Sequence, residues 1–295
     1  MMRYMQTPMT DPAGLAAALR EQGYLPEDGL ATAAYLAIRM HRPLFLEGDA
    51  GVGKTSLAEA LAGVTGRELI RLQCYEGIDA SQALYDWDFP RQVLHLRASE
   101  TAGVLEPEAL ERSLYDRRFL IARPILRAIE SAGAVLLIDE IDRADDEFEA
   151  FLLEVLAENA VTIPELGTIR AETPPIVVLT SNRTREVHDA LKRRCLYHWV
   201  AHPPFDREVA ILRRRLPELS DQLARDVAGA VRRMREADLL KPPGVAESID
   251  WARALQILGA RTLDRELAAA TLGAVLKYQE DAARVRDTVL AELAG

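Results

Sequence analysis

The sequence predicts an α/β fold in which a parallel five-stranded sheet lies between helices and is followed by an all-α domain. Short apolar runs alternate with helix-forming segments over residues 1–203, a pattern typical of parallel sheets with helical crossovers. Residues 204–295 show only helical patterns, and the turn-forming triplet His202, Pro203 and Pro204 precedes them. We therefore expect a first domain at 1–203 and a smaller helical domain at 204–295.

The composition describes a globular and acidic chain. Of the 295 residues, 49% are hydrophobic, and 36 basic against 46 acidic side chains give a net charge of −10. This balance counts against a protein that coats the phosphate backbone of nucleic acid. The two cysteines, Cys74 and Cys195, fit a reducing cytoplasm better than a disulfide framework. No signal peptide is expected in residues 1–8, and the longest apolar runs are too short to span a bilayer.

The expected elements follow from these patterns. Strands are expected at 43–46, 68–73, 134–140, 176–180 and 196–200. The third strand is continuously apolar, so we expect it to be buried on both faces. Helices are expected at 11–22, 27–40, 56–64, from the end of the first insertion to about 130, from 145 onward and at 187–194, with four or five more after 204. Two insertions interrupt the alternation, an aromatic and acidic segment at about 75–97 and a hairpin at about 160–175.

Residues 48–55 match the pattern Gly-x-x-x-x-Gly-Lys-(Ser/Thr) between an expected strand and an expected helix. Glycines allow a tight turn whose backbone N–H groups point at a polyphosphate, and the helix adds its own free N–H groups. In this motif Lys54 contacts the β- and γ-phosphates and the Thr55 hydroxyl binds Mg²⁺. The sequence therefore predicts a site for ATP and Mg²⁺. Its expected residues are Gly48, Asp49, Ala50, Gly51, Val52, Gly53, Lys54, Thr55 and Ser56.

An acidic pair, Asp139 and Glu140, ends the most apolar strand, and Asn182 follows the fourth strand. In a parallel sheet the carboxyl ends of the strands share one edge, where ligands bind. We expect Asp139 to hold Mg²⁺ directly or through water, and Glu140 to orient and deprotonate an attacking water. Asn182 is expected to position the same water or to contact the γ-phosphate. Together with the phosphate loop, these residues predict hydrolysis of ATP.

Three arginines are candidates for stabilising charge on the transferred phosphate. Arg193 and Arg194 end the helix before the fifth strand, and Arg253 lies near the start of a helix in the second domain. An arginine finger inserted into a neighbouring subunit's site stabilises phosphoryl transfer, and Arg253 would bend back onto the γ-phosphate. Basic residues at a helix C-terminus are also favourable without any catalytic role, and Arg253 equally fits a surface position. The sequence leaves these interpretations open.

The chain resembles an AAA+ ATPase in the order of its motifs. These are the phosphate loop, the pair Asp139 and Glu140, Asn182, Arg194 and, inside a helical lid, Arg253. The insertion after the second strand and the hairpin before the fourth resemble the MoxR group. Longer strings resemble the CoxD-type MoxR ATPases of carbon monoxide dehydrogenase maturation, and the resemblance spans roughly residues 20–260. These strings are Leu72-Gln73-Cys74-Tyr75-Glu76-Gly77, Ala83-Leu84-Tyr85-Asp86-Trp87, Phe89-Pro90-Arg91-Gln92, Thr162-Ile163-Pro164-Glu165-Leu166-Gly167-Thr168-Ile169 and Leu179-Thr180-Ser181-Asn182-Arg183-Thr184-Arg185.

The resemblance implies a P-loop AAA+ domain with an all-α lid, acting as a hexameric ATPase and remodelling chaperone. It also implies a companion protein with a von Willebrand factor A domain, and a client apo-metalloenzyme whose copper–sulfur–molybdenum centre is completed. By motif matching, Tyr24 lies near the adenine. Arg194 is the finger that acts in trans, with Arg193 as the alternate, and Arg253 is the sensor of the lid. The implied location is the cytoplasm, or the inner face of the membrane through partner proteins.

Two other functions would use the same residues. A motor or loader on nucleic acid shares the ATPase core, but the acidic balance and the lack of an aromatic and basic groove disfavour it. A nucleotide-gated interaction module without hydrolysis does not need Glu140 beside Asp139. A copper site at Cys195, His198 and His202 is also disfavoured, because Cys195 and His198 point to opposite faces of a strand.

Overall fold

The computed structural model describes residues 10–102 and 107–292, which form two compact units. The sheet unit contains residues 32–47 and 61–198. The helical unit contains the described residues up to 31, residues 48–60 and those from 199 onward. The helical unit thus gathers the C-terminal helices, the N-terminal helix and the phosphate loop, and the division into domains at residue 203 stays a prediction.

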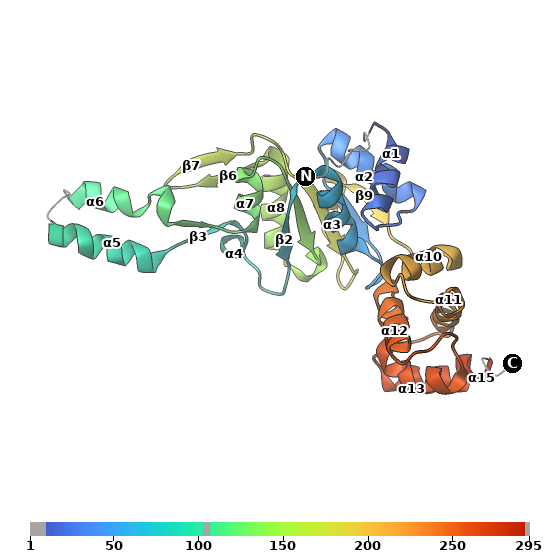
Figure 1. Ribbon diagram of the computed structural model, residues 1–295. Coiled ribbons are helices and arrows are strands. Elements are labelled where there is room, and N and C mark those ends of the chain that lie inside the picture. Colours follow the sequence, from blue (N-terminus) through green and yellow to red (C-terminus); the bar gives the residue numbers. More distant parts are fainter. Residues whose placement is uncertain (1–9, 103–106, 293–295) are drawn as a thin grey trace. The chain divides into compact units, whose positions relative to one another are not determined.

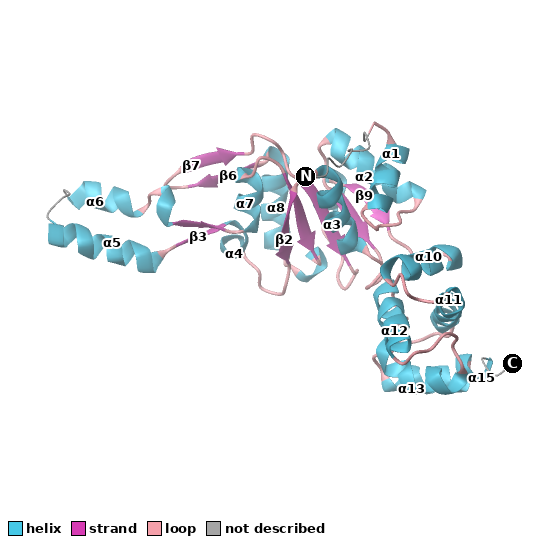
Figure 2. Ribbon diagram, viewed as in Figure 1, coloured by secondary structure: helices cyan, strands magenta, loops and turns pink. Residues whose placement is uncertain are grey.

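A parallel five-stranded sheet forms the sheet unit, as predicted (Figure 2). Its strands lie in the order β2-β5-β8-β1-β9. Every residue of β5 and β8 is buried, which their continuous apolar runs require. β5 pairs in parallel with β2 and β8, and β8 pairs in parallel with β1. The carboxyl ends of these four strands therefore share one edge. The strands are β1 (Leu44–Glu47), β2 (Glu68–Gln73), β5 (Ala134–Asp139), β8 (Ile176–Ser181) and β9 (Leu196–Trp199).

Helices with clear start signals cover the sheet within this unit. α7 (Pro124–Glu130) begins with Pro124 and packs against β2 and β5. α8 (Asp146–Glu158) begins at Asp145, whose carboxylate accepts the N–H of Phe148 at 2.9 Å. α8 packs against α9 (Asp189–Arg194). Apolar side chains of α7, α8 and the sheet form one core, which includes Ile125, Leu126, Phe148, Leu152, Leu136, Ile138 and Leu179.

The insertion after β2 is longer than the expected segment 75–97. It contains α4 (Ala80–Leu84), β3 (Tyr85–Trp87), α5 (Phe89–Ala102), α6 (Pro107–Leu114), η1 (Arg117–Phe119) and β4 (Leu120–Ala122). β3 pairs antiparallel with β4, so the insertion ends only at Ala122. Figure 1 shows α5 and α6 side by side, projecting away from the sheet. The expectation of one helix-forming segment up to Glu130 was wrong, because η1 and β4 separate α6 from α7.

The aromatic residues of this insertion differ in exposure. The Trp87 ring packs edge-on against Tyr115, with ring centroids 5.4 Å apart, and also contacts the core of the sheet unit. Phe89, by contrast, is 65% exposed on α5. Trp87 therefore helps to fix the insertion to the sheet, whereas Phe89 lies on its surface.

The second insertion is a β-hairpin before β8. β6 (Ala160–Ile163) and β7 (Gly167–Arg170) pair antiparallel, with Ile163 opposite Gly167. The turn residues Pro164 to Leu166 connect them, as the local pattern predicts.

In the helical unit, Trp251 is fully buried at the centre of a second apolar core, and its indole N–H donates to Thr271 at 2.7 Å. Arg235 forms a buried bidentate pair with Glu208, at 2.7 and 2.8 Å. The C-terminal helices of this unit are α10 (Phe205–Arg215), α11 (Asp221–Glu236), α12 (Val245–Ile257), α13 (Arg265–Val275), α14 (Gln279–Asp287) and α15 (Val289–Glu292).

Three helices belong to the N-terminal part of the chain: α1 (Pro12–Glu21), α2 (Asp28–Met40) and α3 (Lys54–Thr65). Asp11 caps α1 by accepting the N–H of Gly14 at 2.7 Å, and Pro12 follows it, as the sequence predicts. None of the described helices has the length and apolar character needed to span a bilayer.

Candidate active site

The phosphate loop, residues 48–55, lies in the helical unit and continues along the chain from the end of β1. α3 begins at Lys54, so the free N–H groups of that helix end lie at the loop. Lys54 is buried, and its ammonium donates to the backbone oxygens of Gly48 and Asp49, at 2.7 Å in each case. The loop therefore combines a cation with backbone N–H donors, which a polyphosphate requires.

The first turn of α12 packs directly on this loop. Gly51 has φ +78°, and its carbonyl accepts the N–H groups of Val245 at 3.0 Å and Ala246 at 3.2 Å. Gly244 precedes α12 with φ −81°, which any residue adopts, yet a Cβ there would lie 2.6 Å from the carbonyl oxygen of Ala50. Glycine is therefore needed at this position for close approach, and not for backbone freedom. The start of α12 thus packs against the loop backbone at Ala50 and Gly51.

Replacing Gly244 by Ala is expected to weaken ATP binding by about tenfold. The added methyl group must displace the loop backbone, and overpacking of this kind costs about 1–3 kcal/mol. Isothermal titration calorimetry with ATP measures the change. Gly229→Ala is the matched control, because a Cβ at this helical position meets only Phe205, at 3.8 Å. Equal ATP affinity in Gly244→Ala and the parent protein would show that this contact does not shape the loop.

Two more side chains of the helical unit border the loop. A Cβ on Gly53 would lie 3.9 Å from Cε2 of Tyr24, so the residue expected near the adenine lies beside the loop. Burial raises the pKa of the Tyr24 phenol well above its usual range, which keeps it protonated. Nε2 of His202 lies 3.2 Å from Oδ2 of Asp49. Burial, and then the charge of Arg235, lower the pKa of His202, so its imidazole is neutral at neutral pH.

Arg253 is not brought to the loop. It is exposed on α12, and no contact between it and the loop is found among the residues that the structure describes. At the loop lies instead Glu247, whose Oε2 would be 2.7 Å from a Cβ on Gly51. Glu247 also accepts the N–H of Gly244 at 3.0 Å, which caps the start of α12. The role of Arg253 as a sensor stays a prediction from the resemblance.

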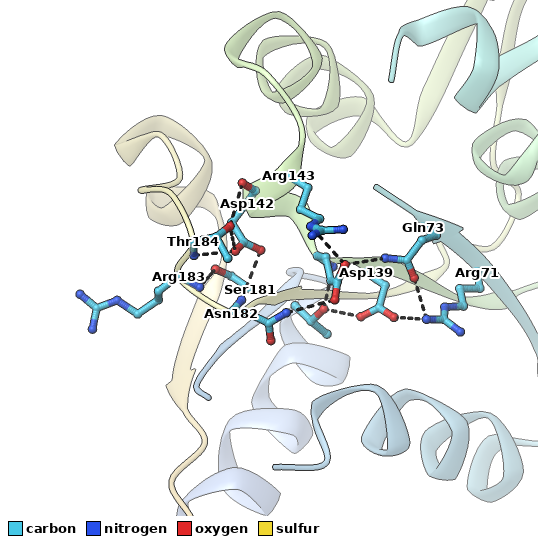
Figure 3. Close-up of polar contacts among 11 residues, drawn as sticks. Arg71, Gln73, Asp139, Asp142, Arg143, Ser181, Asn182, Arg183 and Thr184 are labelled. Atoms are coloured by element: carbon cyan, nitrogen blue, oxygen red, sulfur yellow. Dashed lines mark hydrogen bonds and ion pairs between the residues drawn. The ribbon is translucent and has the colours of Figure 1, made fainter. Parts of the chain in front are cut away.

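In the sheet unit, the adjacent ends of β5 and β8 bring Asp139, Glu140 and Asn182 together. Figure 3 shows Asp139 and Asn182 at these strand ends. Thr180 connects the two strand ends, because its hydroxyl donates to Oδ1 of Asp139 and accepts the N–H of Glu140 at 2.9 Å. Asp139 is buried, and its Oδ2 pairs with the guanidinium of Arg71 at 2.5 Å. The parallel strand order thus places the three predicted polar residues at one edge of the sheet.

The Glu140 carboxylate is held by two side-chain amides. Asn182 donates from Nδ2 to Oε1, and Gln73 donates from Nε2 to Oε2, at 3.1 Å in each case. The guanidinium of Arg143 lies 3.6 Å from Oε2. A carboxylate has about four acceptor sites, so these contacts orient Glu140 and leave it able to accept a proton. This arrangement suits a general base that acts on water.

Comparison with known families agrees with these features. A family model described as "AAA domain (dynein-related subfamily)" matches residues 43–195, more than half of the chain. The chain belongs to this family. The matched range contains the phosphate loop, the acidic pair and Asn182. The protein therefore has the nucleotide-binding fold of an AAA+ ATPase-type domain, a class whose members commonly oligomerise.

Individual proteins show more limited similarity to this AAA domain protein. A stretch of 48 residues is 46% identical to midasin of Giardia intestinalis, and it covers 16% of this chain and 1% of midasin. The RuvB Holliday junction branch migration motor of Thermotoga maritima and one of its mutants align with TM-scores of 0.45 and 0.46. These alignments are 16% and 17% identical, and they cover 86% and 83% of this chain and 67% of each RuvB chain.

Arg71 and Gln73 of the AAA domain are contacts of the acidic pair that the sequence analysis missed. Both are exposed and alternate with the buried Ile70 and Leu72, so they share one face of β2. Gln73 lies opposite Asp139 in the parallel register of β2 and β5. The sequence does show that both residues are polar and lie near the end of a strand. This pattern predicts a contact with the acidic pair only when β2 and β5 are known to be neighbours.

The predicted finger residues, Arg193 and Arg194, end α9 of the AAA domain, and both are exposed. Arg42 caps this helix end by donating to the backbone oxygens of Arg193 at 2.7 Å, Arg194 at 3.1 Å and Cys195 at 3.2 Å. The Arg194 guanidinium donates to the carbonyl of Leu153 at 2.8 Å. Among the described residues, the Arg193 guanidinium has no hydrogen bond or ion pair. Which of the two arginines acts as the finger stays a prediction from the resemblance.

The predicted Mg²⁺ ligands, Thr55 and Asp139, offer a hydroxyl and a carboxylate, which are the hard oxygen donors that Mg²⁺ prefers. Both carboxylate oxygens of Asp139 already accept, from Thr180 and from Arg71. This favours binding through a water molecule, since Mg²⁺ usually retains several. The residues present therefore fit the ion.

Cys74 and Cys195 are both buried as free thiols. Within residues 10–102 and 107–292, no group of three or more His, Cys, Asp and Glu side chains is placed to hold a metal ion. The Cys195 thiol donates to the carbonyl of Leu191 at 3.2 Å. Burial raises the pKa of both Cys74 and Cys195 to about 12, so neither is a thiolate at neutral pH.

Proposed function

We propose that this protein is an ATP-hydrolysing MoxR-type AAA+ chaperone that remodels a client metalloenzyme. The client process is maturation of the copper–sulfur–molybdenum centre of carbon monoxide dehydrogenase. The protein works as a hexamer with a von Willebrand factor A companion, in the cytoplasm or at the inner face of the membrane through partners. Membership of the AAA domain family supports the ATPase core. The strings at 72–77 and 162–169 support the narrower function by resemblance.

The single observation that supports hydrolysis is the arrangement of Glu140 between two amide donors. A protein that only senses ATP does not need a carboxylate held in this way. In the proposed reaction, Glu140 takes a proton from water while the water oxygen bonds to the γ-phosphorus and the bond to the β-phosphate oxygen breaks. Asn182 fixes the direction of the carboxylate and the position of the water.

The remaining residues bind and orient the nucleotide. Lys54 and the N–H groups of the phosphate loop bind the β- and γ-phosphates. Thr55 and Asp139 would hold Mg²⁺, which would neutralise phosphate charge when bound. Tyr24 packs near the adenine, and an arginine of a neighbouring subunit stabilises the charge of the transition state.

ATP turnover and native mass, measured with and without nucleotide, test this function. We expect phosphate release that needs Mg²⁺ and an oligomer that forms or tightens with ATP. A monomer that binds ATP without turnover would contradict the proposal and favour a nucleotide switch.

Addition of an apo-metalloenzyme client tests the narrower function. We expect the apo form of carbon monoxide dehydrogenase, together with the companion protein, to raise ATP turnover, whereas the holo form has no effect. The proposal would be contradicted if the apo-enzyme had no effect on ATP turnover, and DNA or RNA raised it with a steep salt dependence. That result would favour a motor on nucleic acid.

A further inference from the structure

The loop after β8 contains backbone strain next to the candidate general base. Arg183 has φ +58° and Glu140 has φ +56°, both in the left-handed region that is unfavourable for residues with a Cβ. Such conformations persist only where surrounding contacts enforce them. Glu140 itself accepts a hydrogen bond from Asn182, and Arg183 directly follows Asn182 in the chain. Other groups must therefore hold this loop in place.

Asp142 makes the contacts that hold it (Figure 3). Asp142 is 3% exposed and lies in η2 (Ile141–Arg143), the turn that follows Glu140. Its Oδ1 accepts the backbone N–H of Asn182 at 3.2 Å. Its Oδ2 accepts the backbone N–H of Thr184 at 2.8 Å and the Thr184 hydroxyl at 2.6 Å. One carboxylate thus binds the residues on both sides of the strained Arg183.

Asn182 connects the contacts of Asp142 to the candidate general base, Glu140. With its backbone N–H on Asp142, Asn182 directs its side-chain amide to Oε1 of Glu140 at 3.1 Å. Glu140 is the N-cap of η2, and Asp142 lies within it. The two carboxylates that Asn182 contacts therefore come from residues only two positions apart. If Asn182 moves, Glu140 keeps the contact with Gln73 alone among its two amide donors.

We infer that Asp142 is a positioning residue for ATP hydrolysis: its carboxylate holds the loop at 181–184 so that Asn182 orients Glu140. This inference rests on the proposed function of Glu140 as general base. Asp142 itself does not contact Glu140's carboxylate in any of the bonds described. Its effect on turnover passes through Asn182.

Asp142→Asn tests the inference. Asn offers one oxygen where the carboxylate offers two, so at least one of the three donors loses its acceptor. We expect kcat to fall about tenfold, and KM for ATP to change by less than about twofold, because only the orientation of the base is affected. In the Asn182→Ala background, Asp142→Asn is expected to lower kcat by less than about twofold, since the residue it positions is gone.

Asp145→Asn is the matched control. Asp145 lies three residues further along and caps α8, and Asn is an equally good N-cap, so kcat is expected to stay unchanged. Thr184→Val provides a second variant if Asp142→Asn is poorly folded. It removes the hydroxyl donor to Asp142 and keeps the carboxylate. We expect a smaller loss of kcat, again absent in the Asn182→Ala background.

Hydrogen exchange gives a readout that does not depend on activity. In Asp142→Asn, the amides of Asn182 and Thr184 are expected to exchange faster than in the parent, whereas the amides of β5 are unaffected. Equal kcat in the parent and in Asp142→Asn would overturn the inference. It would also be overturned if Asp142→Asn lowered kcat by the same factor in the parent and in the Asn182→Ala background. An inactive parent protein would overturn the proposed function instead, so the two failures are distinguishable.

Discussion

Glu140→Gln is expected to lower ATP turnover by at least about 100-fold, the contribution typical of a positioned general base. Gln has the shape of Glu, but its amide cannot take a proton from water. It also presents an NH₂ group to one of the two donors, Asn182 and Gln73, that hold the carboxylate. ATP binding is expected to stay within about twofold, because the phosphate loop is unchanged. Single-turnover phosphate release and equilibrium binding measure the two effects separately.

Glu147→Gln is the control for this substitution. Glu147 is an exposed carboxylate in the first turn of α8, seven residues from Glu140, and its loss is expected to leave turnover unchanged. Equal turnover in Glu140→Gln and the parent would contradict the role of Glu140. It would favour an interaction module that is gated by nucleotide binding without hydrolysis.

Local features of the sequence were sufficient to predict the sheet. The continuous apolar runs at 134–138 and 176–179 favour strands that are buried on both faces, and β5 and β8 are fully buried. The alternation of strands and helices implies parallel pairing, which places Asp139, Glu140 and Asn182 at one edge. The phosphate loop is recognisable because its glycines and lysine have fixed spacing.

Features that depend on pairing between distant segments were not predictable in this way. Gln73 reaches Glu140 only because β2 and β5 are neighbours in register, and several strand orders are compatible with the same alternation. Likewise, Asp142 acquires its donors from a loop 40 residues later. The length of the insertion depends on the pairing of β3 with β4, three residues each, whose patterns are too short to recognise.

The close packing of α12 on the phosphate loop was also missed for a physical reason. Gly244 follows Pro242 and Pro243, so its sequence context indicates an ordinary turn. Any residue can adopt its φ, so the glycine is explained by close neighbours of a Cβ at this position, above all the carbonyl oxygen of Ala50 at 2.6 Å and the Cα of Gly51 at 2.9 Å. A sequence pattern records backbone preference, but it does not record a steric neighbour almost 200 residues away.

Removal of the trans-acting arginine is expected to have the other large effect on turnover. An arginine finger contributes about 10³–10⁵-fold to hydrolysis in related chemistry, and it acts on the transition state more than on bound ATP. The resemblance favours Arg194, but the Arg194 guanidinium already donates to Leu153 of its own chain. We therefore expect Arg193→Ala to lower turnover about 1,000-fold, and Arg194→Ala to lower it less. Steady-state turnover at saturating ATP, with ATP affinity measured in parallel, checks both.

Arg215→Ala is the matched control, because Arg215 is also an exposed arginine in the last turn of a helix, α10. Unchanged turnover in both Arg193→Ala and Arg194→Ala would exclude this helix end as the source of the finger. A larger loss in Arg194→Ala would show that its bond to Leu153 is released in the oligomer, which is plausible energetically because an exposed hydrogen bond is worth only about 0.5–1.5 kcal/mol.

Mixed oligomers test whether the arginine acts in trans. Arg193→Ala subunits retain Glu140, and Glu140→Gln subunits retain Arg193, so each variant alone lacks one part of every site. If the finger comes from a neighbour, a site formed by the first type of subunit receives Arg193 from the second. Mixing the two inactive proteins is then expected to restore a fraction of the parent turnover. Mixed oligomers that form, as shown by native mass, yet stay inactive would mean that Arg193 acts within its own subunit.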